Sequence, residues 1–533
     1  MEEPQSIEEA LTGPEAKEWQ AAIDEEIAAM ENDTWKTVDQ LPKNHKAVSS
    51  KIVFKKKLDS QGRVEKYKAR LVARGFTQRP GIDYKETFAP VIKFESIRVL
   101  LALAAKEDWE IAQFGIKTAF LNGDLDEEVY MELPACVVKK GKSLVRLTKS
   151  IYGLKQSSRQ WNKRFDKFVK RFKFKASSAD SCVYVGKVRN AQVILALYVD
   201  DGLLMSISYI ALLEIMDRLR NEFEITIGNS QYFVGLELKR DRLKRKLFIG
   251  QSNYMKRVIN KFNMTDAKTV ATPAENNTHL STKMSKDALE IAIPYREAVG
   301  SLIFAACISR SDIMYAVSVV SRYLANPGHE HWLAVKRILR YIKGTINYGI
   351  VYEGTMEDCG LIGFTDADYA GDPDTRKSTS GYIFTLCGGP VSWMSQRQRI
   401  VAMSTTEAEY VAASDATKEL IWLRHLLKSV GALNDGPTTL KVDNQGAIKL
   451  IKNPEYHKRT KHIEVRYHFI REKYNDGQIE IVYVPSSDQL ADILTKALSK
   501  ELFIRLRDQL QIEDITAKFS TGGSVEESHI TSF

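Results

Sequence analysis

The sequence predicts a multidomain chain of the α/β class, and three observations support this prediction. The chain has 533 residues, which is enough for several domains. Residues 251–350 carry apolar side chains at helical spacing, as in HEHWLAVKRILRYIKG. Residues 359–500 combine three consecutive strand-like segments with a later alternation of helix and strand. That order predicts a mixed α/β sheet in the last third of the chain.

The N-terminal part of the chain combines helices with a basic, strand-rich segment. The first 35 residues look helical, with a capping-box pattern from Ser6 to Glu9 and with Pro14 placed to open a second helix. Between residues 51 and 80, ten Lys or Arg stand against two acids, and they interleave with apolar residues. A charge run is usually a solvated face, but this interleaving is typical of a basic sheet surface.

Helices and strands mix from about residue 97 to 250, and the last third has a readable order. We expect a strand (LIGFTDA), a hairpin (SGYIFTLCG, PVSWMSQR), a helix (TEAEYVAASDATKELIWLRHLLKSV), a strand (TLKVDN), a short helix, a strand (IEIVYVP) and a last helix (DQLADILTKAL). The final segment, TGGSVEESHITSF, is polar, and we expect it to be frayed or disordered.

Composition points to an intracellular protein with a polyanionic partner. The formal net charge is +9 and the pI is near 8.9, which suits such a partner. The five cysteines are scattered and lack CxxC spacing, which argues against a disulfide framework or a zinc ribbon and for a reducing compartment. No apolar run approaches the length needed to cross a bilayer, so we expect no membrane partner.

Two adjacent carboxylates, Asp200 and Asp201, lie at the centre of the apolar run LALYVDDGLLM. An unpaired buried carboxylate is costly, so the pair needs a cation or a turn to explain it. Asp-Gly between two apolar runs is also the strongest short-range hairpin signal. The two explanations are compatible, because a tight turn presents carboxylates rigidly at the edge of a sheet.

One carboxylate falls at each structurally useful point of the last third: Asp366, Glu409, Asp443 and Asp492. Each has a local alternative. Glu409 follows Thr406 at capping-box spacing, Asp443 could cap the next helix, and Asp492 could complement a helix dipole. Together, however, such carboxylates can converge on two divalent cations about 4 Å apart, the arrangement that hydrolyses phosphoesters.

The local sequences around these carboxylates indicate a particular family. FTDADYAGDPDTRKSTSGYIF, STTEAEYVAASDATKE, VDNQGAIKL, KHIEVRYHFIRE and QLADILTKAL resemble the ribonuclease H domain of Ty1/copia-type retrotransposon Pol proteins. By that resemblance, the four carboxylates are a metal-binding tetrad, and Asp368 is the second choice for the first position. VPSSDQLAD lacks the His that many cellular ribonucleases H carry. We expect His462 and His468 to have packing and hydrogen-bonding roles. For His329 and His331, whose spacing also suits a metal site on a strand, we favour packing over metal binding because they open a helix.

The same resemblance covers residues 33–350. KARLVARGFTQRPGIDYKETFAPV resembles the fingers of copia-type reverse transcriptases, which implies that Lys68 and Arg70 contact the incoming triphosphate. SIYGLKQSSRQW implies that Gln156 touches the nascent base pair. LYVDDGLL resembles the hairpin that presents Asp200 and Asp201 to metal. In GIKTAFLNGDL, Phe120 aligns with the aromatic residue that excludes a ribose 2′-hydroxyl.

That last motif lacks its expected carboxylate. The family pattern begins with Asp, and this position is Gly115 here. Asp108 and Asp124 lie too far along the chain to substitute. Losing a metal ligand should cost on the order of 10- to 100-fold or more, so we expect DNA synthesis to be impaired while ribonuclease activity remains. The alternative is a decayed or co-opted relic that binds nucleic acid without catalysis.

The resemblance also implies an organisation and a set of partners. We expect an N-terminal helical segment (1–32), reverse transcriptase fingers and palm (33–250), a helical thumb or connection region (251–355), a ribonuclease H-like domain (356–500) and a tail (501–533). Each active site would take two Mg²⁺ or Mn²⁺ ions. The implied partners are an RNA template, a DNA primer, an RNA/DNA hybrid, dNTPs and other Pol products such as integrase. The implied location is cytoplasmic and particle-associated, with the nucleus as an alternative.

Overall fold

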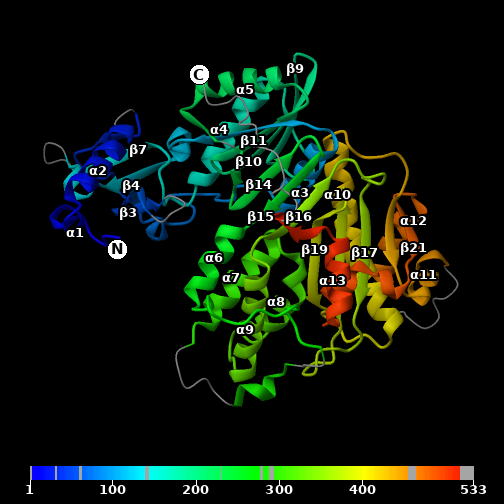
Figure 1. Cartoon of the computed structure of the whole chain (residues 1–533). Coiled ribbons are helices and arrows are strands. Elements are labelled where there is room, and N and C mark those ends of the chain that lie inside the picture. The colour runs from blue at the N-terminus through cyan, green and yellow to red at the C-terminus, as the bar shows by residue number, and fades with distance from the viewer. Residues whose placement is uncertain are drawn as a thin grey trace.

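The computed structural model is mixed α/β, as the sequence predicts (Figure 1). It describes residues 3–30, 33–58, 63–138, 143–228, 230–276, 280–286, 293–453 and 464–516. In Figure 1 the N-terminal helices and their hairpin lie at the left, helices α6 to α9 at the bottom, and the C-terminal sheet at the right.

An acidic helical segment packs on a basic hairpin at the N-terminus. The elements are α1 (Ile7–Thr12), α2 (Ala16–Met30), β3 (Ser50–Leu58) and β4 (Val64–Ala73). The predicted cap is confirmed, because Ser6 accepts a hydrogen bond from the Glu9 amide at 3.1 Å. Trp19 of α2 packs on Phe54, with ring centroids 5.2 Å apart. Since strand side chains alternate, α2 covers the face with Phe54 and leaves Lys55 and Lys57 exposed on the other.

Two sheets build the next part of the chain. A small one has the order β1-β7-β6-β2, with β1 (Trp35–Thr37), β2 (Ala47–Val48), β6 (Asp124–Glu132) and β7 (Leu144–Lys149). A larger one, which we call the central sheet, has the order β12-β5-β11-β10-β9-β8. Its strands are β5 (Glu110–Ile116), β8 (Lys175–Ala176), β9 (Val183–Val188), β10 (Ala191–Tyr198), β11 (Asp201–Ser206) and β12 (Ile225–Gly228). Helices α3 (Phe94–Lys106), α4 (Ser157–Arg171) and α5 (Tyr209–Glu222) accompany it.

The segment after residue 250 is helical, as predicted. It contains α6 (Ser252–Lys261), α7 (Tyr295–Ile308), α8 (Met314–Ser321) and α9 (His329–Gly344). A further sheet has the order β13-β14-β15-β16-β22, with β13 (Tyr232–Phe233), β14 (Leu236–Asp241), β15 (Lys246–Gly250), β16 (Tyr348–Glu353) and β22 (Ile512–Asp514). This sheet combines strands from three of the predicted parts: β13 to β15 come from residues 33–250, β16 from 251–355 and β22 from 501–533. Residues 501–516, assigned to a tail, contribute β22 and most of α13 (Lys500–Gln509); residues 517–533 lie outside the described residues.

The C-terminal sheet has the order β19-β18-β17-β20-β21. Its elements are β17 (Ile362–Ala367), β18 (Thr379–Leu386), β19 (Gly389–Arg397), α10 (Thr405–Ser429), β20 (Thr438–Val442), α11 (Gln445–Lys452), α12 (Glu464–Asn475) and β21 (Ile479–Tyr483). Strands β17, β20 and β21 run parallel, while β18 and β19 are antiparallel to their neighbours. The predicted mixed sheet is therefore confirmed.

The predicted last helix is wrong in type. Residues 490–494 form the 3₁₀ turn η9 (Leu490–Leu494) instead of an α-helix. Gln489 explains the tight conformation, because its side chain accepts from the Ala491 amide at 3.2 Å and donates to the Thr365 carbonyl at 2.9 Å. The segment is thereby tied to β17 and buried against it.

Candidate metal centres

The acidic tetrad, Asp366, Glu409, Asp443 and Asp492, gathers at one edge of the C-terminal sheet. Asp366 is in β17 and Asp443 follows β20, and these strands pair in parallel, with Thr365 opposite Val442. Parallel strands end at the same sheet edge, so the two carboxylates meet. One carboxylate oxygen from each of Asp366, Glu409 and Asp443 lies within 4.8 Å of the others.

The local alternatives for these carboxylates are not what the structure uses. Ser404, not Thr406, caps α10, and its side chain accepts from the Glu407 amide. Asn444, not Asp443, caps α11. Glu409 and Asp443 therefore do not cap the helices next to them, and both turn toward Asp366 instead.

Burial and mutual repulsion raise the pKa values of three carboxylates of the tetrad. Burial, followed by the charges of Asp366 and Asp443, raises the pKa of Glu409 well above its usual value. Burial and Asp366 likewise raise the pKa of Asp443. The pKa of Asp492 rises to about 7 for the same two reasons, against the opposing effect of Lys496. Such a cluster is costly to ionise unless a cation joins it.

The free acceptor atoms of the cluster suit a divalent cation. Glu409 Oε2 and Asp443 Oδ1 are buried and accept no hydrogen bond from any residue that the structure describes. Hard divalent cations bind oxygen ligands, and carboxylates are the ligands that Mg²⁺ takes from proteins. The donor set therefore fits Mg²⁺ or Mn²⁺ in chemistry and charge.

Three polar neighbours orient the tetrad. The Thr495 hydroxyl donates to Asp366 Oδ2, and the Ser486 hydroxyl donates to Asp443 Oδ2 at 2.8 Å. Lys496 Nζ lies 2.8 Å from Asp492 Oδ1 and 3.7 Å from Asp366 Oδ2. Lys496 was not predicted from the sequence, because its approach to Asp492 and Asp366 depends on the turn after η9.

Asp368 points to a different environment. Its carboxylate accepts from the Thr379 amide, and burial raises its pKa to about 6. It is outside the cluster that Asp366, Glu409 and Asp443 form. Between the two choices for the first tetrad position, this geometry favours Asp366.

A second acidic pair, which with Gly115 we call the hairpin centre, lies on the central sheet. Asp200 and Asp201 follow β10, and Tyr198 pairs with Asp201 across a tight turn. Val199 in that turn has a φ of +57°, which is strained for a β-branched residue. Burial, then the charge of Asp200, raises the pKa of Asp201. The predicted hairpin is therefore confirmed, and it presents both carboxylates at its turn.

Gly115 occupies the neighbouring position. It pairs with Asp201 on one side and with Thr226 on the other. A Cβ built on Gly115 would lie 3.3 Å from Asp201 Oδ1 and 3.1 Å from Thr226 Oγ1. Residue 115 is thus the place where a third carboxylate would join the pair, and glycine supplies no ligand there.

Basic and aromatic side chains stand near the hairpin centre. Arg70 lies over the ring of Tyr152 at 4.5 Å, and Tyr152 contacts Phe120 with ring centroids 4.8 Å apart. Burial raises the pKa of Tyr152, and Asp200 adds to that effect. Burial, then Arg70, lowers the pKa of Lys68. Tyr152 was quoted within a motif but was not singled out from the sequence.

Gln156 and His331 are engaged inside the protein. Gln156 is fully buried; its side chain accepts from Gln78 at 3.1 Å and donates to the Asp83 carbonyl at 2.9 Å. The structure therefore does not bring it to the hairpin centre as an open contact. His331 stacks on Tyr323 and accepts from the Gly328 amide, which is a packing role. His462 and the side chain of His468 lie outside the described residues.

A family match defines the class of protein. Residues 32–276 match the family described as "Reverse transcriptase (RNA-dependent DNA polymerase)". That region contains the hairpin centre, the basic hairpin and the central sheet. The chain therefore carries a reverse transcriptase domain.

Long relatives narrow the family. The chain is 44% identical over 511 residues to the "Retrovirus-related Pol polyprotein from transposon TNT 1-94" of Nicotiana tabacum, with 94% of this chain and 38% of that protein covered. It is 40% identical to the polyprotein from transposon RE2 of Arabidopsis thaliana, with 91% and 33% covered. Over most of its length, the chain is therefore similar to the Pol polyproteins of copia-type retrotransposons. It spans little more than a third of the length of these relatives.

A foamy viral protease-reverse transcriptase in complex with double-stranded DNA aligns with 88% of this chain and 70% of its own, at 14% identity and a TM-score of 0.48. Within the described ranges, none of the helices combines the length and the apolar character needed to cross a membrane.

Proposed function

We propose that this chain hydrolyses the RNA strand of RNA/DNA hybrids at the acidic tetrad. The observation that carries the proposal is the convergence of Asp366, Glu409 and Asp443 within 4.8 Å, with buried oxygens that have no hydrogen-bond partner among the described residues. Without a cation, this arrangement is electrostatically unfavourable. Bound cations would offset this repulsion and stabilise the folded chain.

The residues of the chain have distinct roles in this proposal. Asp366, Glu409, Asp443 and Asp492 would hold two Mg²⁺ or Mn²⁺ ions, which when bound activate water and stabilise the leaving oxygen. Thr495 and Ser486 orient Asp366 and Asp443 through their hydroxyl groups. Lys496 offsets part of the negative charge, and its side chain is partly exposed to solvent.

The hairpin centre supports a second proposed activity, RNA-directed DNA synthesis from dNTPs, in an impaired form. Asp200 and Asp201 would hold the metal, Lys68 and Arg70 would hold the triphosphate, and Phe120 would contact the sugar. The buried Gln156 would support this part of the protein through its hydrogen bonds to Gln78 and Asp83 instead of touching the base pair. Impairment follows from Gly115, because two-metal phosphoryl transfer needs a further carboxylate from the neighbouring strand. The division into fingers and palm (33–250), a thumb or connection region (251–355) and a ribonuclease H-like domain (356–500) belongs to this proposal, as do the RNA template, DNA primer and integrase partners. Residues 501–516 pack with these parts through β22 and α13 and so do not form a free tail.

The competing function is a relic that binds nucleic acid without catalysis. Gly115 favours it, because a ligand is missing from one centre. The tetrad argues against it, because unselected carboxylates this close together would destabilise the fold. Hybrid cleavage therefore distinguishes the two functions.

The test measures cleavage of a hybrid with a labelled RNA strand in Mg²⁺. We expect the wild-type chain to cleave and Asp443→Asn to lose activity by on the order of 100-fold or more. Asp415→Asn is the matched control, because Asp415 is on α10 but pairs with Lys418 instead of joining the tetrad. Hybrid binding in EDTA should be equal in all three proteins. Equal cleavage by wild type and Asp443→Asn would exclude the tetrad, and wild-type binding without cleavage would support the relic.

A further inference from the structure

Arg98 joins three distant parts of the chain at the seam between the central sheet and the C-terminal sheet. It belongs to α3, beside the central sheet, and only 1% of its surface is exposed. Its Nε donates to the Val391 carbonyl of β19 at 2.7 Å. Its Nη1 donates to the carbonyls of Cys307 and Ile308, both at 2.9 Å, in α7. One guanidinium group therefore connects α3, α7 and β19.

An aromatic ring completes this junction. The Arg98 guanidinium lies 3.9 Å from the ring centroid of Trp393 in β19, and Trp393 Nε1 donates to the Ala306 carbonyl at 2.9 Å. Glu95, one turn earlier in α3, accepts from Arg98 Nη2 at 2.9 Å and supplies the counter-charge. A planar guanidinium holds donors at fixed angles, so these contacts define an orientation as well as a distance.

A second set of contacts ties α10 and the residue that follows it to β10 and to loops beside the central sheet. Trp422 Nε1 donates to the Ala179 carbonyl at 2.8 Å, and Lys93 Nζ lies 4.2 Å from the Trp422 ring centroid. Gln192 Nε2 donates to the Val430 carbonyl at 2.7 Å. The two sheets are thus joined at separate points along the seam.

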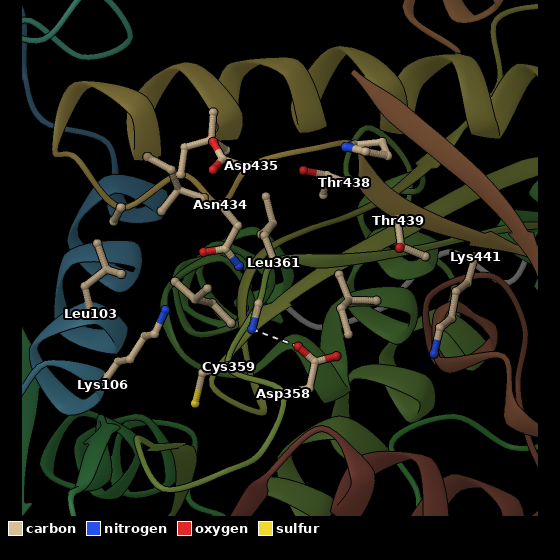
Figure 2. A pocket seen from close by; sticks show the side chains of 17 residues that line it. Leu103, Lys106, Asp358, Cys359, Leu361, Asn434, Asp435, Thr438, Thr439 and Lys441 are labelled. Carbon is tan, nitrogen blue, oxygen red and sulfur yellow. Dashed lines mark hydrogen bonds between the residues drawn. The ribbon is translucent and has the colours of Figure 1, made fainter. Parts of the chain in front are cut away.

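The seam is not packed along its whole length. A cavity of about 300 Å³ lies between Leu103 and Lys106 of α3 and the starts of β17 and β20 (Figure 2). In Figure 2, Lys106 projects from α3 toward the loop that carries Asn434. Buried apolar side chains of α3 and of the C-terminal sheet share one core, and the cavity interrupts their packing at this end. The contacts of Arg98 add directed polar contacts to that apolar docking.

We infer that Arg98 is a positioning residue that sets the placement of the acidic tetrad relative to the hairpin centre. A hybrid held at the hairpin centre then meets the tetrad at one place along its length. Cleavage falls at a constant distance from the primer 3′ end, and loss of Arg98 relaxes that distance. The cleavage readout rests on the proposed function, whereas the docking itself does not.

The experiment uses the full chain, a labelled RNA template with a recessed DNA primer, and Mg²⁺ without dNTPs. The wild-type protein should cut in a narrow window that moves with the primer end when the primer is shortened. Arg98→Met should spread the cuts, with the rate at the wild-type position falling by roughly 10- to 100-fold. Arg98→Met should cleave a long hybrid without a primer end at the wild-type rate. A variant that had lost its fold would cleave this substrate more slowly as well.

Tyr341→Phe is the control for a buried hydrogen bond away from the seam, because the Tyr341 hydroxyl donates to Asp312 in the helical part. It should keep the narrow window. Arg98→Lys keeps the positive charge but lacks the planar guanidinium group, so it should broaden the cleavage window partly. If Arg98→Met does not accumulate as folded protein, Arg98→Lys is the variant to measure. A narrow window in a folded Arg98 variant overturns the inference.

A calorimetric measurement separates this inference from the proposed function. If the wild-type chain cuts no hybrid, the proposed function fails, and unfolding then tests the docking alone. The wild type should unfold in one transition because its two sheets are docked, and Arg98→Lys should divide that transition into two. A single, unshifted transition in the variant overturns the inference.

Discussion

Gly115 and Asp201 stand directly opposite each other on the antiparallel strands β5 and β11. Paired residues of neighbouring strands project to the same face of a sheet, so a side chain at residue 115 would point to the hairpin centre. The 3.3 Å separation between a Cβ at this position and Asp201 Oδ1 is tight for a side chain. A carboxylate here would share the site with Asp201 and would need a cation to do so.

Restoring the carboxylate should restore DNA synthesis. We expect Gly115→Asp to extend a DNA primer on an RNA template with Mg²⁺ and dNTPs, by about 10- to 100-fold or more over wild type, because it returns a missing metal ligand. Gly115→Asn has nearly the same size without the charge and should not rescue. Comparable extension by the wild-type chain would mean that another group completes the centre.

The metal-free protein should lose stability as pH rises from about 4 to 7. The pKa of Asp492 is near 7 in the folded chain and about 3.9 when unfolded, so the folded state holds a proton that the unfolded state has released. This contribution is complete below pH 4 and is lost as pH rises through the folded pKa. Melting curves in EDTA across this range should show the decline. Asp492→Asn should make it shallower, with Glu409 and Asp443 accounting for the remainder.

Added Mg²⁺ should act in the opposite direction, because ligand carboxylates must be ionised. The increase in melting temperature on adding Mg²⁺ should therefore grow between pH 6 and 8. An increase that is independent of pH would contradict the assignment of Asp492 to the tetrad.

Lys496 should stabilise the metal-free tetrad and compete with cations. Lys496→Met should lower the free energy of unfolding in EDTA by about 1 kcal/mol, a modest value because the side chain is partly exposed and solvent screens its charge. The same variant should bind Mg²⁺ more tightly at pH 8, since a positive charge no longer faces the ligands. Calorimetric titration measures both, and Lys496→Arg should resemble wild type. Weaker Mg²⁺ binding in Lys496→Met would contradict this role.

The sequence predicted these centres unevenly, and the reasons are physical. Strand ends and hairpins follow from alternation and turn residues, so β17, β20 and the Asp200–Asp201 turn could be located in advance. The type of η9 could not, because it depends on Gln489 reaching across to Thr365, a contact 124 residues apart. The burial of Gln156 and the junction at Arg98 likewise depend on contacts between segments that are distant in the chain. Family motifs name such residues but do not give their environment.

The exposed face of the basic hairpin should bind nucleic acid mainly through phosphates. Lys55 and Lys57 lie on this face, opposite the face that α2 covers, so their charges are open to a polyanion. Fluorescence anisotropy of a primer-template over a series of KCl concentrations should give a linear log–log fall in affinity. Lys55→Gln with Lys57→Gln should reduce the slope by about 1 for each lysine that meets a phosphate. Lys244→Gln, an exposed lysine in the turn between β14 and β15, should leave it unchanged. If the double variant shows the same slope of log affinity against log salt concentration as the wild type, this face is not part of the surface that binds the primer-template. The basic hairpin would then contact only the triphosphate.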